Sequence, residues 1–210
     1  MVVATTDYVF RGVSQTYGEP ALQGAVNYRD SSGWFAGAWG SNVDPYPFGS
    51  TEAEINAYAG FGLSLNPEWT ARGTYTRYVY AWKARPKSYD YDEFSMSLAF
   101  EDRWIATVSY EPDSARYSTL GYVHDRPAYS YEMAARWPLP ERLAISAGVG
   151  YYDLTHLYGA GYWSGNAGLD YTHGRFEVQV VRFFSDGTVR RLFGDASADG
   201  SWVATAIFRF

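Results

Sequence analysis

Cysteine is absent from the 210 residues of this sequence, which excludes disulfide bonds and thiolate metal sites. The sequence also lacks any run of about 18 consecutive apolar residues, which excludes a transmembrane helix. Basic residues are too few and too scattered for a nucleic-acid groove, because 17 Lys and Arg stand against 23 Asp and Glu, with a net charge of -6. The classes left open are proteins built mainly from strands.

Residues that favour strands and tight turns are abundant instead. Aromatic residues make up 19% of the chain, with 20 Tyr and 8 Trp, and there are 21 Gly. From Val2 onward, apolar and polar residues alternate in blocks of about ten, the length that a tilted strand needs to cross a bilayer. In YWSGNAGLDYT, for example, Trp163, Leu169 and Tyr171 share one face, while Ser164 and Asp170 share the other. The pattern predicts an all-β protein with a single domain over residues 1–210.

Two kinds of connection separate the predicted strands. Five short polar turns, rich in residues that favour tight turns, lie at 30–33, 66–68, 101–103, 138–141 and 173–175. Six longer links alternate with them, at 11–20, 43–51, 80–91, 112–127, 153–160 and 185–200. This alternation joins about 12 strands and leaves both termini on the side of the short turns, as in bacterial outer-membrane barrels. We therefore expect a transmembrane antiparallel up-and-down β-barrel with periplasmic termini.

Two segments depart from the simple alternation. Residues 115–125 alternate well enough to form a strand, but a thirteenth strand would put the C-terminus on the side of the long links. We expect this segment to extend a strand beyond the membrane. In VQVVRFF, Phe183 falls out of phase with Phe176, which predicts a β-bulge near Val180 and Val181.

The two faces of the predicted strands differ in chemistry. One face is apolar, and its aromatic residues fall near the strand ends in two belts, as on the outer surface of a membrane barrel. The other face carries many charges, which would be costly to bury in a dry core but are accommodated in a hydrated lumen. The expected membrane-interface aromatics are Trp69, Trp104, Trp137, Trp163 and Trp202, and Tyr78 and Tyr80 are expected in the belt near the long links.

The last ten residues, SWVATAIFRF, follow the same rule. Trp202, Phe208 and Phe210 fall on one apolar face together with two alanines. A terminal Phe preceded by alternating aromatic residues is similar to the signal read by the barrel-assembly machinery of Gram-negative bacteria. We expect Phe208 and Phe210 to serve as this assembly signal and to face lipid.

Several segments resemble the TorF-like, Gcw_chp-type family of proteobacterial outer-membrane porins. The segments YVFRGVSQ, PALQG and GWFAGAWGSNV follow one another in the family's order at 8–15, 20–24 and 33–43. EINAYAGF at 54–61 and YEPD at 110–113 are also similar, whereas the link at 114–128 is longer than is usual in the family. The resemblance implies a pore in the outer membrane.

Charged residues on the inward face are candidates for lining a solute pathway. Arg11 lies where the first strand enters a long link and is suited to line a constriction, because rings of charge at narrow points select ions. Alternatively, the inward charges pair across the lumen and stiffen the wall. Since these charges nearly balance while acids are in excess in the long links, a narrow pore with weak cation preference is expected. The pore-lining candidates are Asp7, Arg11, Glu54, Arg72, Glu132, Arg136, Asp170, Glu177 and Arg182.

Passive diffusion of small hydrophilic solutes or ions is the function that these features predict. A closed structural barrel whose outer links dock a partner is the alternative, and a rim hydrolase using His124 or His156 is a third possibility. No spacing brings a nucleophile, a base and an oxyanion donor together, and no acidic run matches a calcium loop, so we expect neither enzyme activity nor a metal or cofactor. The expected partners are outer-membrane lipid and lipopolysaccharide, the barrel-assembly machinery and small solutes, but not nucleic acid.

Overall fold

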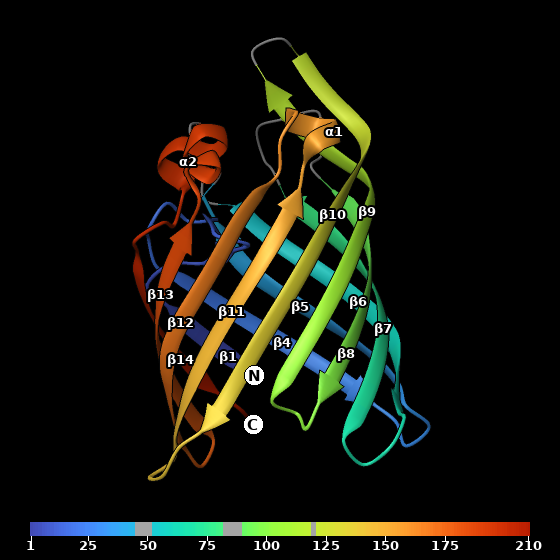
Figure 1. Ribbon diagram of the computed structural model, residues 1–210, viewed down its shortest axis with the longest axis vertical. Coiled ribbons are helices and arrows are strands. Elements are labelled where there is room, and N and C mark those ends of the chain that lie inside the picture. The colour runs from blue at the N-terminus through green and yellow to red at the C-terminus, as the bar shows by residue number, and fades with distance from the viewer. Residues whose placement is uncertain (45–51, 82–89, 119–120) are drawn as a thin grey trace.

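Twelve strands of the computed structural model form one closed antiparallel barrel (Figure 1). The structure describes residues 1–44, 52–81, 90–118 and 121–210. Neighbouring strands follow chain order round the barrel, and β1 closes it by pairing with both β4 and β14. Closure leaves no unpaired sheet edge, which a sheet needs in order to cross a membrane. The barrel strands are β1 (Val2–Thr5), β4 (Ala21–Arg29), β5 (Trp34–Val43), β6 (Glu52–Ser64), β7 (Trp69–Ala81), β8 (Tyr91–Phe100), β9 (Trp104–Ser118), β10 (Gly121–Pro138), β11 (Leu143–Asp153), β12 (Tyr162–His173), β13 (Phe176–Ser185) and β14 (Trp202–Phe208).

The five predicted short turns all connect neighbouring strands at one end of the barrel. Between β8 and β9, Glu101 and Asp102 both adopt positive φ, at 50° and 52°, and the Arg103 N–H donates to the Phe100 carbonyl oxygen at 3.0 Å. Two successive positive φ values match the right-handed twist of the flanking strands, so the turn closes without splaying them. The tight-turn prediction is confirmed at this end.

Longer segments gather at the opposite end. There β9 and β10 rise together well above the other strands (Figure 1), with irregular register between Val123 and Ala128. This confirms, for residues 115–118 and 121–125, that the segment extends strands instead of adding a thirteenth one to the barrel. A short helix α1 (Thr155–Tyr158), a helix α2 (Gly187–Phe193) and a 3-10 turn at Gly194–Ala196 also lie at this end. Neither helix of the described chain is long and apolar enough to cross a membrane.

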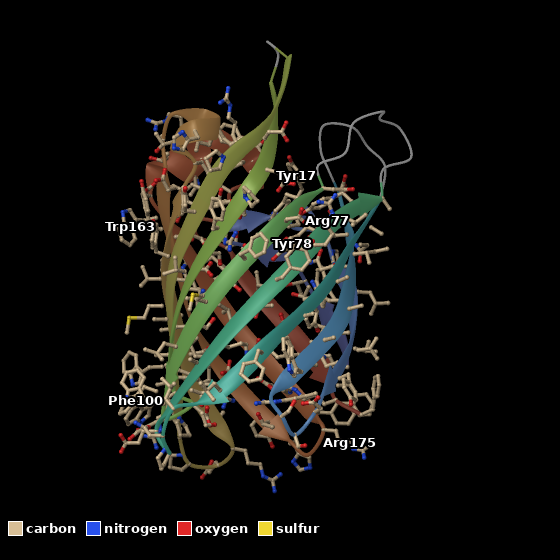
Figure 2. All side chains as sticks on the ribbon, turned by 90° about the vertical axis from the view of Figure 1, so that its right-hand side faces the viewer. Tyr17, Arg77, Tyr78, Phe100, Trp163 and Arg175 are labelled. Atoms are coloured by element: carbon tan, nitrogen blue, oxygen red, sulfur yellow. The ribbon has the colours of Figure 1, made fainter. Side chains whose placement is uncertain are left out.

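The outer surface carries an apolar band between two belts of aromatic rings. Exposed apolar side chains such as Met96 project from the wall, with Trp163 toward the long-link end and Phe100 near the short turns (Figure 2). Within each belt, rings on neighbouring strands lie in contact, with centroid distances of 4.8 to 5.2 Å. Such aromatic pairs stabilise the wall beyond the contribution of each ring alone. The pairs near the short turns are Trp34–Phe61, Trp69–Phe100 and Phe176–Phe208, and those near the long links include Tyr75–Phe94 and Tyr151–Trp163.

The bulge expected in β13 is wrong. Its pairing is continuous with β12 from Phe176 to Ser185 and with β14 from Phe176 to Arg182. Arg182 therefore lies opposite Trp202 on the outer face, with its guanidinium 5.3 Å from the centre of the Trp202 ring. The residue that breaks the apolar pattern is Phe183, which lines a cavity inside the barrel. Arg182 is not a residue of the lumen.

The prediction for Tyr78 and Tyr80 is also wrong, because both face the inside of the barrel. Tyr78 is buried and stacks on Tyr91 with ring centroids 4.3 Å apart. Tyr80 lines an internal pocket near the long-link end. Tyr78 and Tyr80 alternate with the exposed Tyr75 and Val79 along β7, which places both rings on the inward face.

Candidate functional site

The link between β1 and β4 folds into the lumen. Within it, β2 (Val9–Phe10) and β3 (Val13–Ser14) pair as a small separate sheet. Arg11 and Gly12 form its tip, both with positive φ, at 48° and 77°. We call residues 6–18 the luminal hairpin.

Contacts of the luminal hairpin reach several sides of the barrel. The Tyr8 ring lies 5.3 Å from the Trp39 ring in β5, and its hydroxyl donates to the Glu54 carboxylate in β6 at 3.3 Å. The Phe10 ring lies 6.2 Å from the Tyr78 ring in β7. The hairpin thus narrows the lumen from within.

A buried carboxylate holds the luminal hairpin in shape. Asp7 accepts hydrogen bonds from the hydroxyls of Ser14 and Thr16, the latter at 2.9 Å. The Ser14 hydroxyl in turn accepts from the Gly18 N–H at 3.1 Å. Because a buried carboxylate left without donors is costly, Asp7 ties the two arms of the hairpin together.

Arg11 joins the hairpin tip to the opposite wall of the barrel. Its guanidinium donates to Glu93 in β8 at 2.7 Å, to Glu111 in β9 at 2.6 Å and to Glu132 in β10 at 3.3 Å. Strand β9 is six positions from β1 in either direction round the barrel, so the luminal hairpin and the Arg11 side chain together reach from β1 to the opposite wall. Burial opposes the charge on Arg11, but Glu93 and Glu111 outweigh it and hold the pKa of Arg11 well above its ordinary value. Arg11 remains charged and keeps the tip fixed.

The Glu111 carboxylate accepts hydrogen bonds from three side chains. Its two oxygens accept from Arg11 and from the Tyr152 hydroxyl, the latter at 2.7 and 2.8 Å. The Ser114 hydroxyl donates to it as well. The Tyr152 ring also lies 4.9 Å below the Arg11 guanidinium, and such a stacked cation adds attraction between the two side chains.

Two hydrogen bonds to the backbone carbonyl oxygens of Arg11 and Gly12 also hold the hairpin tip. The Tyr162 hydroxyl in β12 donates to the Arg11 carbonyl oxygen at 2.9 Å, and the Ala198 N–H donates to the Gly12 carbonyl oxygen at 3.0 Å. A Cβ atom at Gly12 would lie 2.6 Å from the Cβ of Ser164. Only glycine fits this close approach at a positive φ.

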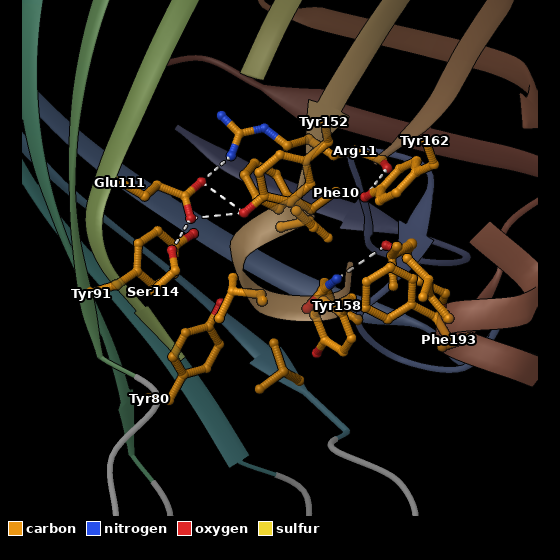
Figure 3. A pocket seen from close by; sticks show the side chains of 18 of the residues that line it. Phe10, Arg11, Tyr80, Tyr91, Glu111, Ser114, Tyr152, Tyr158, Tyr162 and Phe193 are labelled. Carbon is orange, nitrogen blue, oxygen red and sulfur yellow. Dashed lines mark hydrogen bonds and ion pairs between the residues drawn. The ribbon is translucent and has the colours of Figure 1, made fainter. Parts of the chain in front are cut away.

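Above the hairpin, toward the long links, lies a cavity of about 450 Å³ (Figure 3). We call it the aromatic vestibule, because rings cover much of its wall. Its floor is formed by Arg11, Glu111 and Ser114, and apolar residues of α1 and α2 close one side. The rings that line it are Phe10, Tyr17, Tyr80, Tyr91, Tyr152, Tyr158, Tyr162 and Phe193.

A second cavity, of about 370 Å³, lies beside the hairpin against β9 to β13. Thr107, Glu132, Asn166 and Phe183 are among the residues that line it. Arg11 lines this cavity as well as the aromatic vestibule. Both spaces are therefore bordered by the side chain that joins the hairpin tip to β8, β9 and β10.

Toward the short turns, the lumen holds smaller charge pairs. Arg136 donates to the buried Asp170 at 3.0 Å, and Arg209 donates to Glu177 at 2.6 Å. Arg72 stacks over the Phe35 ring at 5.1 Å. The Arg136–Asp170 and Arg209–Glu177 pairs are of the kind expected if inward charges pair with one another and stiffen the wall.

Eight of the nine expected pore-lining residues lie inside the barrel, and Arg182 does not. Arg11, Glu54 and Glu132 gather at the luminal hairpin, and Asp7 lies within the hairpin itself. The remaining four, Arg72, Arg136, Asp170 and Glu177, lie nearer the short turns. Whether any of them touches a passing solute stays a prediction.

Sequence reasoning missed Glu93 and Glu111 as parts of this cluster. Glu93 shares the inward face of its strand, a signal that marked it as luminal but not as a partner of Arg11. Glu111 precedes Pro112, which suggested that a link had begun, whereas β9 continues to Ser118. The side chain of His124, proposed for a rim hydrolase, lies outside the described residues, and His156 lies in α1.

A family model for Gcw_chp, described as a bacterial protein of unknown function, matches residues 1–192. The chain belongs to the Gcw_chp family. No curated protein matches it. Membership confirms the Gcw_chp-type assignment made from the N-terminal motifs. The family description gives no function.

Solved porin structures share the fold. The NanC porin superposes with a TM-score of 0.69 at 8% identity, covering 100% of both chains. The KdgM porin gives a TM-score of 0.58 at 7% identity, covering 100% of this chain and 99% of that one. A structure of the KdgM porin in complex with disordered oligogalacturonate gives 0.56 at 8% identity with the same coverage. At these identities the likeness shows the fold alone, a closed barrel of the porin type.

Proposed function

We propose that the chain forms a channel in the bacterial outer membrane for passive diffusion of small hydrophilic solutes or ions. The observation that carries this proposal is a lumen lined by charged side chains inside a barrel with an apolar outer band. Lipid favours the band, and only a hydrated interior accommodates the inward charges. The aromatic vestibule and the second cavity both border Arg11, and the proposed path for solutes runs past this side chain, between the luminal hairpin and the wall.

The hairpin level sets the expected ion preference. Carboxylates there outnumber guanidinium groups, which favours cations over anions at the narrowest level. Lower in the lumen, Arg72 and Arg136 oppose this bias. A weak cation preference follows. The carboxylates at the hairpin level are Asp7 and Glu54, which bond to uncharged side chains, and Glu93, Glu111 and Glu132, which bond to Arg11.

Membership of the TorF-like porins, periplasmic termini and contact with lipopolysaccharide belong to the same proposal. The exposed Phe210 and the outward Phe208, which packs on Phe176 at 4.8 Å, support recognition of the last strand by the barrel-assembly machinery.

The oligogalacturonate named with the KdgM porin is an acidic sugar, and the acidic excess at the luminal hairpin does not favour such a solute here.

A closed barrel that presents its outer links to a partner is the second candidate. The luminal hairpin favours it, because Arg11 bonds to three strands on the far wall and leaves little free cross-section there. In this case the hairpin is a permanent plug and the inward charges only stiffen the barrel.

Single-channel recording separates the two candidates. Refolded protein would be inserted into a planar bilayer under a salt gradient, after heat-modifiable migration has confirmed that it is folded. Discrete conductance steps with a reversal potential shifted toward cations are expected. A silent bilayer with folded protein, together with liposomes that do not swell in small sugars, would support the closed barrel.

A further inference from the structure

We propose that the aromatic vestibule binds a small quaternary ammonium compound, a cation that carries no N–H donors. The inference goes beyond the proposed channel, because a ligand can occupy this space whether or not the lumen conducts. It rests on three properties of the vestibule: its rings, its committed polar groups and its net charge.

Rings face the vestibule from opposite sides. Figure 3 shows Tyr80 and Tyr91 on one side of the cavity and Tyr158 and Phe193 on the other. Its volume of about 450 Å³ lies within the range of roughly 300 to 1,000 Å³ typical of small-molecule sites. Aromatic faces around a confined, partly dry space attract cations through the ring quadrupole.

Arg11 is itself a cation that lies against aromatic rings at the floor of the vestibule. The guanidinium of Arg11 lies 4.7 Å from the Phe10 ring centre and 4.9 Å from that of Tyr152. The protein therefore holds one cation against this set of rings by its own side chain. The rings higher in the vestibule offer a similar surface to a ligand.

Polar groups at the floor are committed to one another. Glu111 accepts from Arg11, Tyr152 and Ser114, and the guanidinium of Arg11 donates to three carboxylates. A cation with N–H donors would lose their hydration at the floor, where three donors already occupy most of the acceptor sites of Glu111, and this loss is costly. A quaternary ammonium group needs no acceptor, so it avoids this cost.

The net charge of the vestibule also favours a positively charged ligand. The acids that line the vestibule, Glu111 and Asp44, exceed the charge of Arg11 by one, and Glu93 and Glu132, which are not among the lining residues, bond to the same guanidinium. Among the described residues that line the vestibule, Arg11 is the one cation. The field in the cavity therefore favours a positive ligand and disfavours an anion.

Isothermal titration calorimetry on refolded protein in detergent tests the proposal directly. Choline is the quaternary probe, 3,3-dimethyl-1-butanol its neutral carbon isostere, ethanolammonium a cation with N–H donors, and 3,3-dimethylbutanoate an anion of similar shape. We expect choline to bind about tenfold more tightly than each of the other three, in line with cation–π attraction in a desolvated site. Absence of saturable choline binding, or equal binding of the neutral isostere, would overturn the proposal.

Matched variants locate the site. Tyr158→Leu removes a vestibule ring and is expected to weaken choline binding about fivefold to tenfold, whereas Tyr158→Phe keeps the ring and the affinity. Tyr131→Leu, on the exposed outer face, is the control and should leave binding unchanged. If Tyr158→Leu does not refold, Phe193→Leu tests the same wall. Because calorimetry detects binding in a barrel that does not conduct, a silent bilayer with intact choline binding would remove the channel and keep this site.

Discussion

Replacing Arg11 by alanine should loosen the luminal hairpin and raise conductance. The guanidinium is only 5% exposed, and two of its partners, Glu93 and Glu111, are 8% and 2% exposed. Removing one member of such a buried ion cluster costs about 3 to 5 kcal/mol, because the remaining charges lose their partner. Glu132 is 40% exposed and adds little, since water screens it.

The magnitude gives a measurable outcome. Taking the lower limit, about 3 kcal/mol shifts the balance between seated and released hairpin by roughly 100-fold, since 1.4 kcal/mol is a factor of ten. Backbone anchors at Arg11 and Gly12 survive the substitution, so part of the hairpin stays close to the wall near β12. Single-channel records of Arg11→Ala should show a larger or more frequently open conductance than the wild type.

The control is Arg136→Ala, which removes another luminal guanidinium. Its side chain is 47% exposed, and it pairs with Asp170 away from the hairpin, so only a small change in conductance is expected. If Arg11→Ala folds, as judged by heat-modifiable migration, and conducts like the wild type, the hairpin is not the constriction. The reasoning from the Arg11 cluster would then be refuted.

Three further predictions concern other parts of the barrel. Arg72→Glu and Arg136→Glu should each shift the reversal potential in a salt gradient toward that of cations, and an unchanged potential would remove both residues from the pathway. Gly12→Ala should displace the hairpin tip, because its Cβ would meet Ser164 at 2.6 Å; we expect faster cleavage of the hairpin by added protease, and wild-type cleavage kinetics would contradict this. Deletion of Phe210 should lower the amount of folded barrel in cell membranes while leaving refolding in detergent unchanged, and equal loss in both would point to a structural role instead of an assembly signal.

Local patterns were sufficient for the strands and short turns. The outward face of YWSGNAGLDYT alternates as expected, because lipid accepts only apolar side chains at those positions. The polar residues at Glu101 and Asp102 predict a tight turn, and both adopt the positive φ that such a turn requires. The error at Arg182 came from the expected bulge, because unbroken alternation from Phe176 places this side chain on the outer face beside Trp202.

Contacts between distant segments were beyond those patterns. The motif YVFRGVSQ marked Arg11 as notable, but nothing near it in the sequence pointed to Glu93 or Glu111, which lie 82 and 100 residues away. Tyr78 and Tyr80 resembled belt residues because aromatic rings suit both the membrane interface and a crowded interior. Alternation with the exposed Tyr75 and Val79 places both rings inside, where Phe10 of the luminal hairpin lies beside Tyr78.

The sequence by itself therefore determined the barrel: its strand number, its two faces and its two kinds of connection, because each follows from alternation and turn chemistry within a few residues. Only the tertiary structure decided what the lumen contains. Barrel closure brings β8, β9 and β10 opposite the link after β1, so that Arg11 meets three carboxylates from across the barrel. The constriction and the aromatic vestibule above it exist because closing the ring sets these strands face to face, a proximity that separation along the chain does not encode.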